Sequence, residues 1–175
     1  MLSQWQHILR PIDCGPMRLK NRLTSAPINT GLENLSNLAA LADFYAEAAA
    51  DGVSLVTLFS PALSGQAKQN ADIQPAVSDD FHRYKPILKA VSSFDCRVAI
   101  ELNHIGQDAG VLFPISSVPG VSKHTGKSFY AAPAFLIRKA IHQFAQCAQR
   151  AASVGFDAVE INASGRSLIA SFLSP

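Results

Sequence analysis

Short apolar runs alternate along the chain with longer stretches of helical periodicity, and this alternation restricts the fold more than any other feature. The run Val53–Phe59 is nearly all apolar and lies between Gly52 and Pro61, which is typical of a strand buried on both faces of a parallel sheet. The same order of strand and helix recurs. The expected strands are Arg22–Ala26, Val53–Phe59, Arg97–Leu102 and Phe156–Ile161. The expected helices are Leu38–Ala50, Phe81–Phe94, Phe135–Val154 and one that begins near Ser167.

Four successive strand–helix units predict an α/β fold, in which helices pack on a parallel sheet. The 175 residues suit one domain, so we predict a single domain over residues 1–175. Two connections, Ser60–Asp80 and Gly106–Pro133, exceed the roughly 12–15 residues usual for a loop in a compact domain. Both follow the carboxyl ends of predicted strands, where α/β folds place their functional sites.

Composition excludes several classes of protein. A hydrophobic fraction of 48% with a net charge of +2 argues against disorder, and the absence of a basic run argues against a nucleic-acid partner. The apolar stretches are far shorter than the ~20 residues of a membrane span, and Met1–Arg10 has no apolar signal core. Cys14, Cys96 and Cys147 lack the paired spacing of a disulfide framework or zinc site. We therefore expect no metal and no membrane partner, and a location in the reducing cytoplasm.

A series of short motifs follows one order through the chain. They are Leu9–Pro11, Met17–Arg22, Ser25–Pro27, Phe44–Glu47, Gly52–Val53, Glu101–Gly106, Gly155–Ile161 and Ser171–Pro175. The series resembles the Old Yellow Enzyme family, in its branch of NADH:flavin oxidoreductases that contains bacterial 2,4-dienoyl-CoA reductase. The resemblance implies a TIM barrel that binds FMN, is reduced by NAD(P)H and reduces an activated alkene. Because a TIM barrel takes about 250 residues, the four βα units of this chain predict half of a TIM (β/α)8 barrel.

The resemblance places one edge of the flavin against the loop after the first strand. Pro27, Ile28 and Asn29 form that loop, and the Asn29 side chain could donate to a flavin carbonyl. The same residues also suit an ordinary strand-to-loop turn. Ser60 matches a small residue after the second strand whose backbone approaches the ring, although Leu58–Phe59 replaces the usual Thr-Glu.

Glu101 stands where the family has Gln. A Gln amide both donates to and accepts from the pyrimidine edge of the flavin, whereas an ionised carboxylate only accepts. Burial favours the neutral acid, so either Glu101 is protonated in a flavin complex or the flavin is not held here in the usual way. An ion pair of Glu101 with Arg97 or Arg166 is an equally good interpretation.

The resemblance also implies catalytic positions. His104 lies in the Asn-His-x-Gly pattern, followed by Gln107 where the family commonly has Arg, and a structural hydrogen bond is favoured over a role as catalytic base. The family's two donors to the substrate carbonyl and its proton-donating Tyr correspond to Asn162, Gly165 and Ser167. Asn162 can still donate, Gly165 has no side chain, and a Ser hydroxyl is a poor acid at neutral pH. Ordinary alkene reduction through a Tyr donor is therefore not expected.

Two further segments carry possible anion ligands. Ser164–Ser167 could bind an anion, although it lacks Walker spacing, and Lys123–Lys127 is favoured as a solvated loop. The phosphate of a TIM-barrel cofactor is commonly held after strands seven and eight, which would lie beyond Pro175.

Three hypotheses remain open. The chain is a half-barrel subunit that needs a second copy or a complementary C-terminal half-barrel, with NAD(P)H and an enone or enoyl compound as substrates. Alternatively, it is a non-catalytic binding or scaffolding subunit of the same fold, or a piece of a longer chain. In each case the outer edges of the first and fourth strands need a cover, because an unpaired edge strand invites association.

Overall fold

The computed structural model describes residues 5–32, 38–59, 73–74, 80–109 and 112–174. Its elements are α1 (Gln6–Leu9), β1 (Ile12–Cys14), β2 (Met17–Leu19), β3 (Thr24–Ser25), α2 (Ala39–Ala50), β4 (Leu55–Leu58), β5 (Ile73–Gln74), η3 (Phe81–Tyr84), α3 (Lys85–Val91), β6 (Arg97–His104), η4 (Gly106–Asp108), β7 (Ile115–Ser116), β8 (Gly120–Val121), β9 (Ser128–Ala131), α4 (Ala134–Val154), β10 (Ala158–Ile161) and α5 (Leu168–Leu173).

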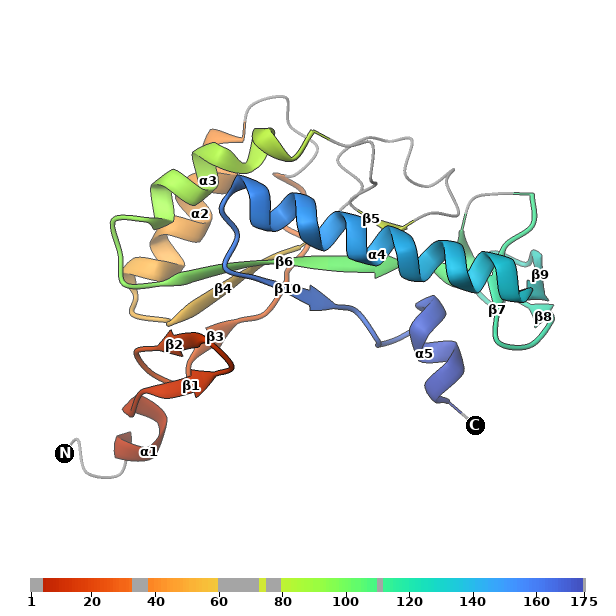
Figure 1. Ribbon diagram of the computed structural model, residues 1–175, viewed down its shortest axis with the longest axis horizontal. Helices are drawn as coiled ribbons and strands as arrows, with labels where there is room; N and C mark the ends of the chain where they lie inside the picture. The colour runs from red at the N-terminus through yellow and green to blue at the C-terminus, as the bar shows by residue number, and fades with distance from the viewer. Residues whose placement is uncertain (1–4, 33–37, 60–72, 75–79, 110–111, 175) are drawn as a thin grey trace. The chain divides into compact units, whose positions relative to one another are not determined.

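The main sheet has the strand order β10-β6-β4-β3, with β5 against β6 (Figure 1). β3 is parallel to β4, and β4 is parallel to β6. The amide of Asp157 donates to Val98 O and that of Asn162 to Leu102 O, both at 2.9 Å, so β10 runs parallel to β6. The helices α2, α3, α4 and α5 each follow one of these four strands. The predicted four βα units and parallel sheet are confirmed.

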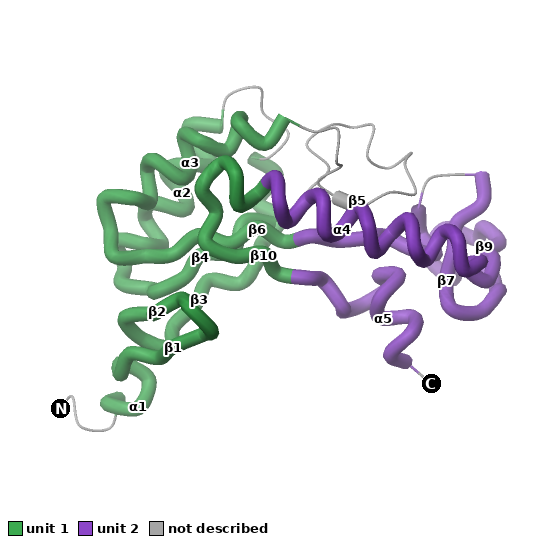
Figure 2. Tube along the Cα trace, in the orientation of Figure 1, with its two compact units in different colours: residues 1–59, 80–101, 151–160 green, residues 60–79, 102–150, 161–175 purple. Residues whose placement is uncertain are grey.

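The chain divides into two compact units (Figure 2). Unit 1 comprises residues 1–59, 80–101 and 151–160, and unit 2 comprises residues 60–79, 102–150 and 161–175. The prediction of one domain over 1–175 stays a prediction. No helix of the described residues is long and apolar enough to cross a membrane, and these residues contain no His, Cys, Asp and Glu cluster that could hold a metal ion.

Unit 1 has a core between its strands and the helices that follow them. Its fully buried side chains include Val56 and Leu58 of β4, Ile100 of β6, Tyr45 of α2 and Ile87 of α3. The Tyr45 hydroxyl accepts a hydrogen bond from the Phe59 amide at 3.1 Å, which ties α2 to the end of β4. Because β4 and β6 are buried along nearly their whole length, their continuous apolar runs are explained.

Unit 2 has a separate core formed by Ile115, Ala140 and Leu168, with Ala132 and Leu136 packed against it. α4 agrees with the predicted helix to within one residue, and Ala140 is buried on its apolar face. Ile141 is 64% exposed, although it lies one turn after Ile137 in the helical period of the sequence. Cys147 is fully buried instead, because it lies two turns after buried Ala140 on the same face.

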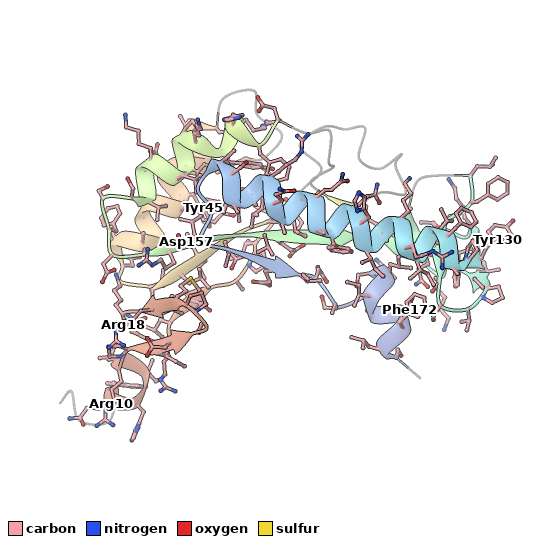
Figure 3. The ribbon with its side chains drawn as sticks, viewed as in Figure 1. Arg10, Arg18, Tyr45, Tyr130, Asp157 and Phe172 are labelled. Atoms are coloured by element: carbon pink, nitrogen blue, oxygen red, sulfur yellow. The ribbon has the colours of Figure 1, made fainter. Side chains whose placement is uncertain are left out.

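The connection Gly106–Pro133 is not the loop that the sequence predicted. It contains η4 and a sheet of order β7-β9-β8, in which β7 is parallel and β8 antiparallel to β9. Phe113 and Tyr130 are both exposed there, and their rings pack edge to face with 5.6 Å between the ring centroids. Tyr130 lies on β9 (Figure 3). These strands have two to four residues each, too short for a recognisable alternation. The other long connection, Ser60–Asp80, lies mostly outside the described residues.

Candidate active site

The predicted site residues follow the carboxyl ends of parallel strands, as the α/β rule requires. Pro27, Ile28 and Asn29 follow β3, and Glu101 lies in the second half of β6. These four residues belong to unit 1. His104 at the end of β6 belongs to unit 2, as do Asn162 and Ser167, which follow β10. Ser60 lies outside the described residues, so its predicted approach to a flavin stays a prediction.

Glu101 is a buried carboxyl group within the sheet. Its side chain is only 3% exposed, and the neighbouring residues Ile100 and Leu102 are fully buried. Because an unpaired charge is costly in such surroundings, the neutral acid or a close polar partner stabilises this position. Burial of the carboxyl group was not visible from composition, but it follows from the apolar run that surrounds Glu101 in the sequence.

Both arginines considered as partners of Glu101 contact other carboxylates. Arg97 Nη1 lies 3.2 Å from Asp157 Oδ1 in unit 1. The second oxygen of Asp157 accepts a hydrogen bond from the Val98 amide at 2.9 Å. In unit 2, Arg166 Nε contacts Asp108 Oδ2. Neither carboxylate was singled out by the sequence analysis, since 60 and 58 residues separate the partners.

The loop after β3 forms a local turn. Asn29 Oδ1 accepts a hydrogen bond from the Gly31 amide at 3.1 Å, so the side-chain oxygen is already used. The Asn29 side chain is exposed, as is Ile28. The side-chain amide nitrogen of Asn29 is a hydrogen-bond donor, which is the kind of group that a flavin carbonyl requires.

His104 is buried and takes part in a tight turn. Its Nδ1 accepts a hydrogen bond from the Gly106 amide at 3.1 Å, which fits the structural role that the sequence favoured. Gly106 has φ +65°, and a Cβ there would lie 2.8 Å from the amide nitrogen of Leu168. The Asn-His-x-Gly pattern is therefore explained by the close approach of this turn to the start of α5.

Asn103 is the first residue of the Asn-His-x-Gly pattern, and the sequence gave it no role of its own. Its Oδ1 is buried and has no hydrogen-bond partner within the described part of the chain. Alternation along β6 places Asn103 on the same face of the strand as Glu101. That alternation, together with its place in the Asn-His-x-Gly pattern, is the signal in the sequence that marks it.

The segment after β10 uses its polar side chains locally. Asn162 Oδ1 accepts from the amide of Ser164 at 2.9 Å and from its hydroxyl at 3.0 Å. Ser167 is buried, and its Oγ accepts from the Ala170 amide at 3.2 Å as the N-cap of α5. Gly165 has φ +59° and contributes backbone only. Ser167 is therefore the N-cap residue of α5.

A pocket of about 290 Å³ adjoins this segment within unit 2. It is lined by Gln107, Ser116, Ser117, Val118, Phe129, Gly165, Arg166, Ala170, Ser171 and Ser174. We call it the Arg166 pocket. Gln107, Gly165 and Arg166 are positions that the sequence comparison with the family considered, and Ser171 and Ser174 belong to its last motif. The other walls come from β7 and the two residues after it, from Phe129 of β9 and from Ala170 of α5.

Comparison with known proteins identifies a family. The family model described as NADH:flavin oxidoreductase / NADH oxidase matches residues 7–175. A bilirubin reductase of Mediterraneibacter gnavus is 27% identical over 95% of this chain and 27% of its own length. An NADPH dehydrogenase of Listeria welshimeri is 31% identical over 90% of this chain and 48% of its own length.

Among solved structures, morphinone reductase in complex with tetrahydroNAD matches with a TM-score of 0.74 at 22% identity, over 92% of this chain and 50% of that one. A 2-naphthoyl-CoA reductase complex matches with a TM-score of 0.77 at 17% identity, over 97% of this chain and 29% of that one. These likenesses establish an α/β fold like that of TIM-barrel enzymes, matched over about half of the morphinone reductase chain. The chain spans from about a quarter to about half of the relatives it matches.

Proposed function

The chain belongs to the NADH:flavin oxidoreductase / NADH oxidase family, and on this premise we propose that it is the N-terminal half-barrel of an FMN-dependent NAD(P)H oxidoreductase of the ene-reductase type. The observation that carries the proposal is the family match over residues 7–175, on a fold with four βα units in barrel order. FMN, when bound, would pass a hydride from NAD(P)H to an activated alkene such as an enone or enoyl compound.

The donor set of this chain fits one edge of a flavin. A protonated Glu101 offers both a donor and an acceptor, as the family's Gln does, and its burial favours that form. The side-chain nitrogen of Asn29 supplies a second donor after β3. Glu101 and Asn29 would therefore bind and orient the pyrimidine part of the cofactor. The phosphate would be held by the other half-barrel, after strands seven and eight.

This chain offers fewer side chains for binding a substrate than for binding the flavin. Asn162 would donate to a substrate carbonyl through its side-chain amide nitrogen, which is the donor group of that side chain. Gly165 has no side chain, and the Ser167 hydroxyl caps α5. We propose that the proton for the alkene carbon comes from water or from the other half-barrel.

The other half-barrel is the partner that this proposal requires, in the same chain or in a separate subunit. β3 and β10 end the strand order of the main sheet, so each has an edge that a further barrel strand could extend. A second copy of this chain is the alternative cover. We also propose a cytoplasmic location, because Cys14, Cys96 and Cys147 are free thiols, as a reducing compartment maintains them.

A specific observation favours a second function. The positions of the family's second substrate donor and its proton donor hold Gly165, with no side chain, and Ser167, a helix cap. This supports a non-catalytic subunit that kept the half-barrel and binds a partner.

One reconstitution experiment separates the two functions. We would mix this chain with the C-terminal half of the Listeria welshimeri NADPH dehydrogenase, titrate FMN by fluorescence quenching, and then add NADPH with 2-cyclohexenone. The flavin proposal predicts quenching and NADPH oxidation in the mixture and neither with the halves alone. A complex that forms but binds no FMN would overturn it and support the non-catalytic function.

A further inference from the structure

The Arg166 pocket is a candidate ligand site, and apart from Gly165 none of its lining residues has a role in the proposed flavin chemistry. It lies within unit 2 alone, and its volume of about 290 Å³ is near the lower limit for sites that bind small molecules. Its walls combine a guanidinium group, an amide and hydroxyl groups with the apolar side chains of Phe129 and Val118. Such a mixture suits a ligand with one polar end and one hydrocarbon end.

Arg166 is anchored on one side of its guanidinium group. Its Nε contacts Asp108 Oδ2, and Asp108 is fixed in turn by the Ser122 hydroxyl, which donates to Oδ1 at 2.6 Å. Because this ion pair uses Nε, the two Nη groups can donate to a ligand. Two N–H groups at this end of the guanidinium match the spacing of the two oxygens of a carboxylate.

The charge of unit 2 favours an anion. Its described residues include six lysines and arginines, whereas Asp108 is the only Asp or Glu among them. The stretch Ala109–Phe156 contains no acidic residue at all. Since Asp108 neutralises one positive charge, the rest produce a positive potential that attracts anionic ligands and disfavours cations.

Hydrogen bonds fix one wall of the pocket. The Ser117 amide donates to Ser171 Oγ at 3.0 Å, and the Ser117 hydroxyl donates to the Ser171 carbonyl oxygen. The Ser171 hydroxyl donates to Leu168 O at 2.6 Å. β7 is thereby joined to α5, so the pocket is formed before a ligand arrives, which lowers the entropic cost of binding.

Gly120 fixes the apolar wall. A Cβ at this position would lie 2.6 Å from Cζ of Phe129, so the Phe129 ring packs directly against the Gly120 backbone. Phe129 therefore offers a hydrocarbon surface in a fixed position beside the polar groups.

We propose that the Arg166 pocket binds a small organic carboxylate. The carboxylate accepts hydrogen bonds from the two Nη groups of Arg166, and the amide of Gln107 offers a further donor. The hydrocarbon part of the ligand packs against Phe129 and Val118. This site goes beyond the proposed oxidoreductase function and needs no flavin.

Calorimetric titration of the full chain with benzoate, in the absence of flavin, tests the proposal. Benzamide is the uncharged probe of the same shape, and we expect benzoate to bind at least about tenfold more tightly. Arg166→Gln should weaken benzoate binding at least about tenfold. Lys127→Gln makes the same change of charge at an exposed residue that does not line the pocket, and should change binding less than about threefold.

Ala170→Leu provides a second variant, because it fills the pocket and leaves the Arg166–Asp108 pair in place. It should abolish benzoate binding while thermal unfolding stays cooperative. No benzoate binding by the unaltered chain, equal binding of benzamide, or equal losses for the Arg166 and Lys127 variants would each overturn the proposal. These results do not depend on FMN, so they leave the oxidoreductase proposal to its own test.

Discussion

Gly106 allows the turn after β6 to approach the backbone at the start of α5. Its φ of +65° lies in the left-handed region, and the position of a Cβ is already occupied by the Leu168 amide. Two costs therefore coincide at this residue, the backbone strain of a side chain at positive φ and a steric clash with backbone atoms that cannot move aside.

Gly126 separates these two costs. It has φ +70° in the turn between β8 and β9, and nothing lies within 4 Å of its Cβ position. Gly126→Ala should reduce the free energy of unfolding by about 1 kcal/mol, and Gly106→Ala by about 3 kcal/mol or more. Urea denaturation of both variants checks this prediction. Equal losses would mean that the backbone near Leu168 moves aside without cost.

Ser167 stabilises α5 by capping its first turn. Ser167→Ala should reduce the free energy of unfolding by about 1 kcal/mol, whereas Ser167→Asp should retain it, because Asp also accepts at an N-cap. Denaturation curves followed by circular dichroism measure both. If Ser167→Ala left stability unchanged, the cap would not contribute and the hydroxyl would be free for another role.

Glu101 tests the proposed flavin contact. Glu101→Gln restores an amide that donates and accepts without a proton, so the reconstituted barrel should bind FMN more tightly than the unaltered chain does. Glu160→Gln on β10 makes the same change at an exposed position and should have no effect. FMN titration by fluorescence gives the dissociation constants. Unchanged affinity in Glu101→Gln would show that this residue does not meet the ring.

Cys96 is a thiol with altered acidity. Desolvation by burial raises the pKa of Cys96 above its ordinary value, and the Lys20 ammonium opposes this only in part. The thiol should therefore react slowly with iodoacetamide at neutral pH and faster only in alkaline solution. The pKa of Cys96 is higher in the folded chain than in the unfolded chain. The contribution of this thiol to the free energy of unfolding is therefore complete below the unfolded-state pKa and is lost as the pH rises through the folded-state pKa. Mass spectrometry of alkylated peptides from pH 7 to pH 10 checks the rate; fast labelling at pH 7 would contradict it.

At the scale of elements, β10 is held to β6 by a reciprocal pair of hydrogen bonds. The Asp157 amide donates to Val98 O, and Asp157 Oδ2 accepts from the Val98 amide, both at 2.9 Å. Val98 is buried, so loss of its acceptor leaves a backbone donor unpaired. The ion pair between Asp157 and Arg97 contributes little to the stability of this pairing, because it is exposed to solvent.

Two substitutions of Asp157 distinguish these contributions. Asp157→Asn keeps an acceptor for the Val98 amide and removes the charge, so it should cost less than about 0.5 kcal/mol. Asp157→Ala removes both and should cost about 1–3 kcal/mol. Chemical denaturation measures the difference. A large loss for Asp157→Asn would mean that the ion pair, and not the hydrogen bond, holds β10 in place.

At the scale of the whole molecule, the described residues place four parallel strands in the main sheet, whereas a TIM barrel closes with eight. β3 and β10 end the strand order, and the chain covers half of the morphinone reductase structure. Edge strands without a cover associate with other strands, so the barrel-forming partner is a physical requirement of the proposal.

Sedimentation of the isolated chain tests this requirement. We expect no stable monomer at micromolar concentration, and a discrete one-to-one complex once a complementary C-terminal half-barrel is added. A clean monomer that ignores the added half would show that the edges are covered within the chain itself.

The sequence by itself determined the succession of strands and helices. α2 and α4 begin and end within one residue of the predicted helices, since their periodicity is a local property that the chain carries wherever it folds. The order of motifs also identified the family, whose model matches residues 7–175, and the apolar run around Glu101 predicts its burial. The β1–β2 hairpin and the β7-β9-β8 sheet were missed, because strands this short carry no readable period.

Only the tertiary structure decided what the polar side chains do. In the folded chain Asp157 pairs with Arg97 and Asp108 pairs with Arg166. The Arg166 pocket is lined by segments as far apart in the sequence as Gln107 and Ser171. The Ser167 hydroxyl caps α5, and His104 Nδ1 accepts a hydrogen bond from the Gly106 amide within a turn. Such partners are set by which backbones meet in space, and hydrophobic spacing along a chain encodes burial but not the identity of a distant neighbour.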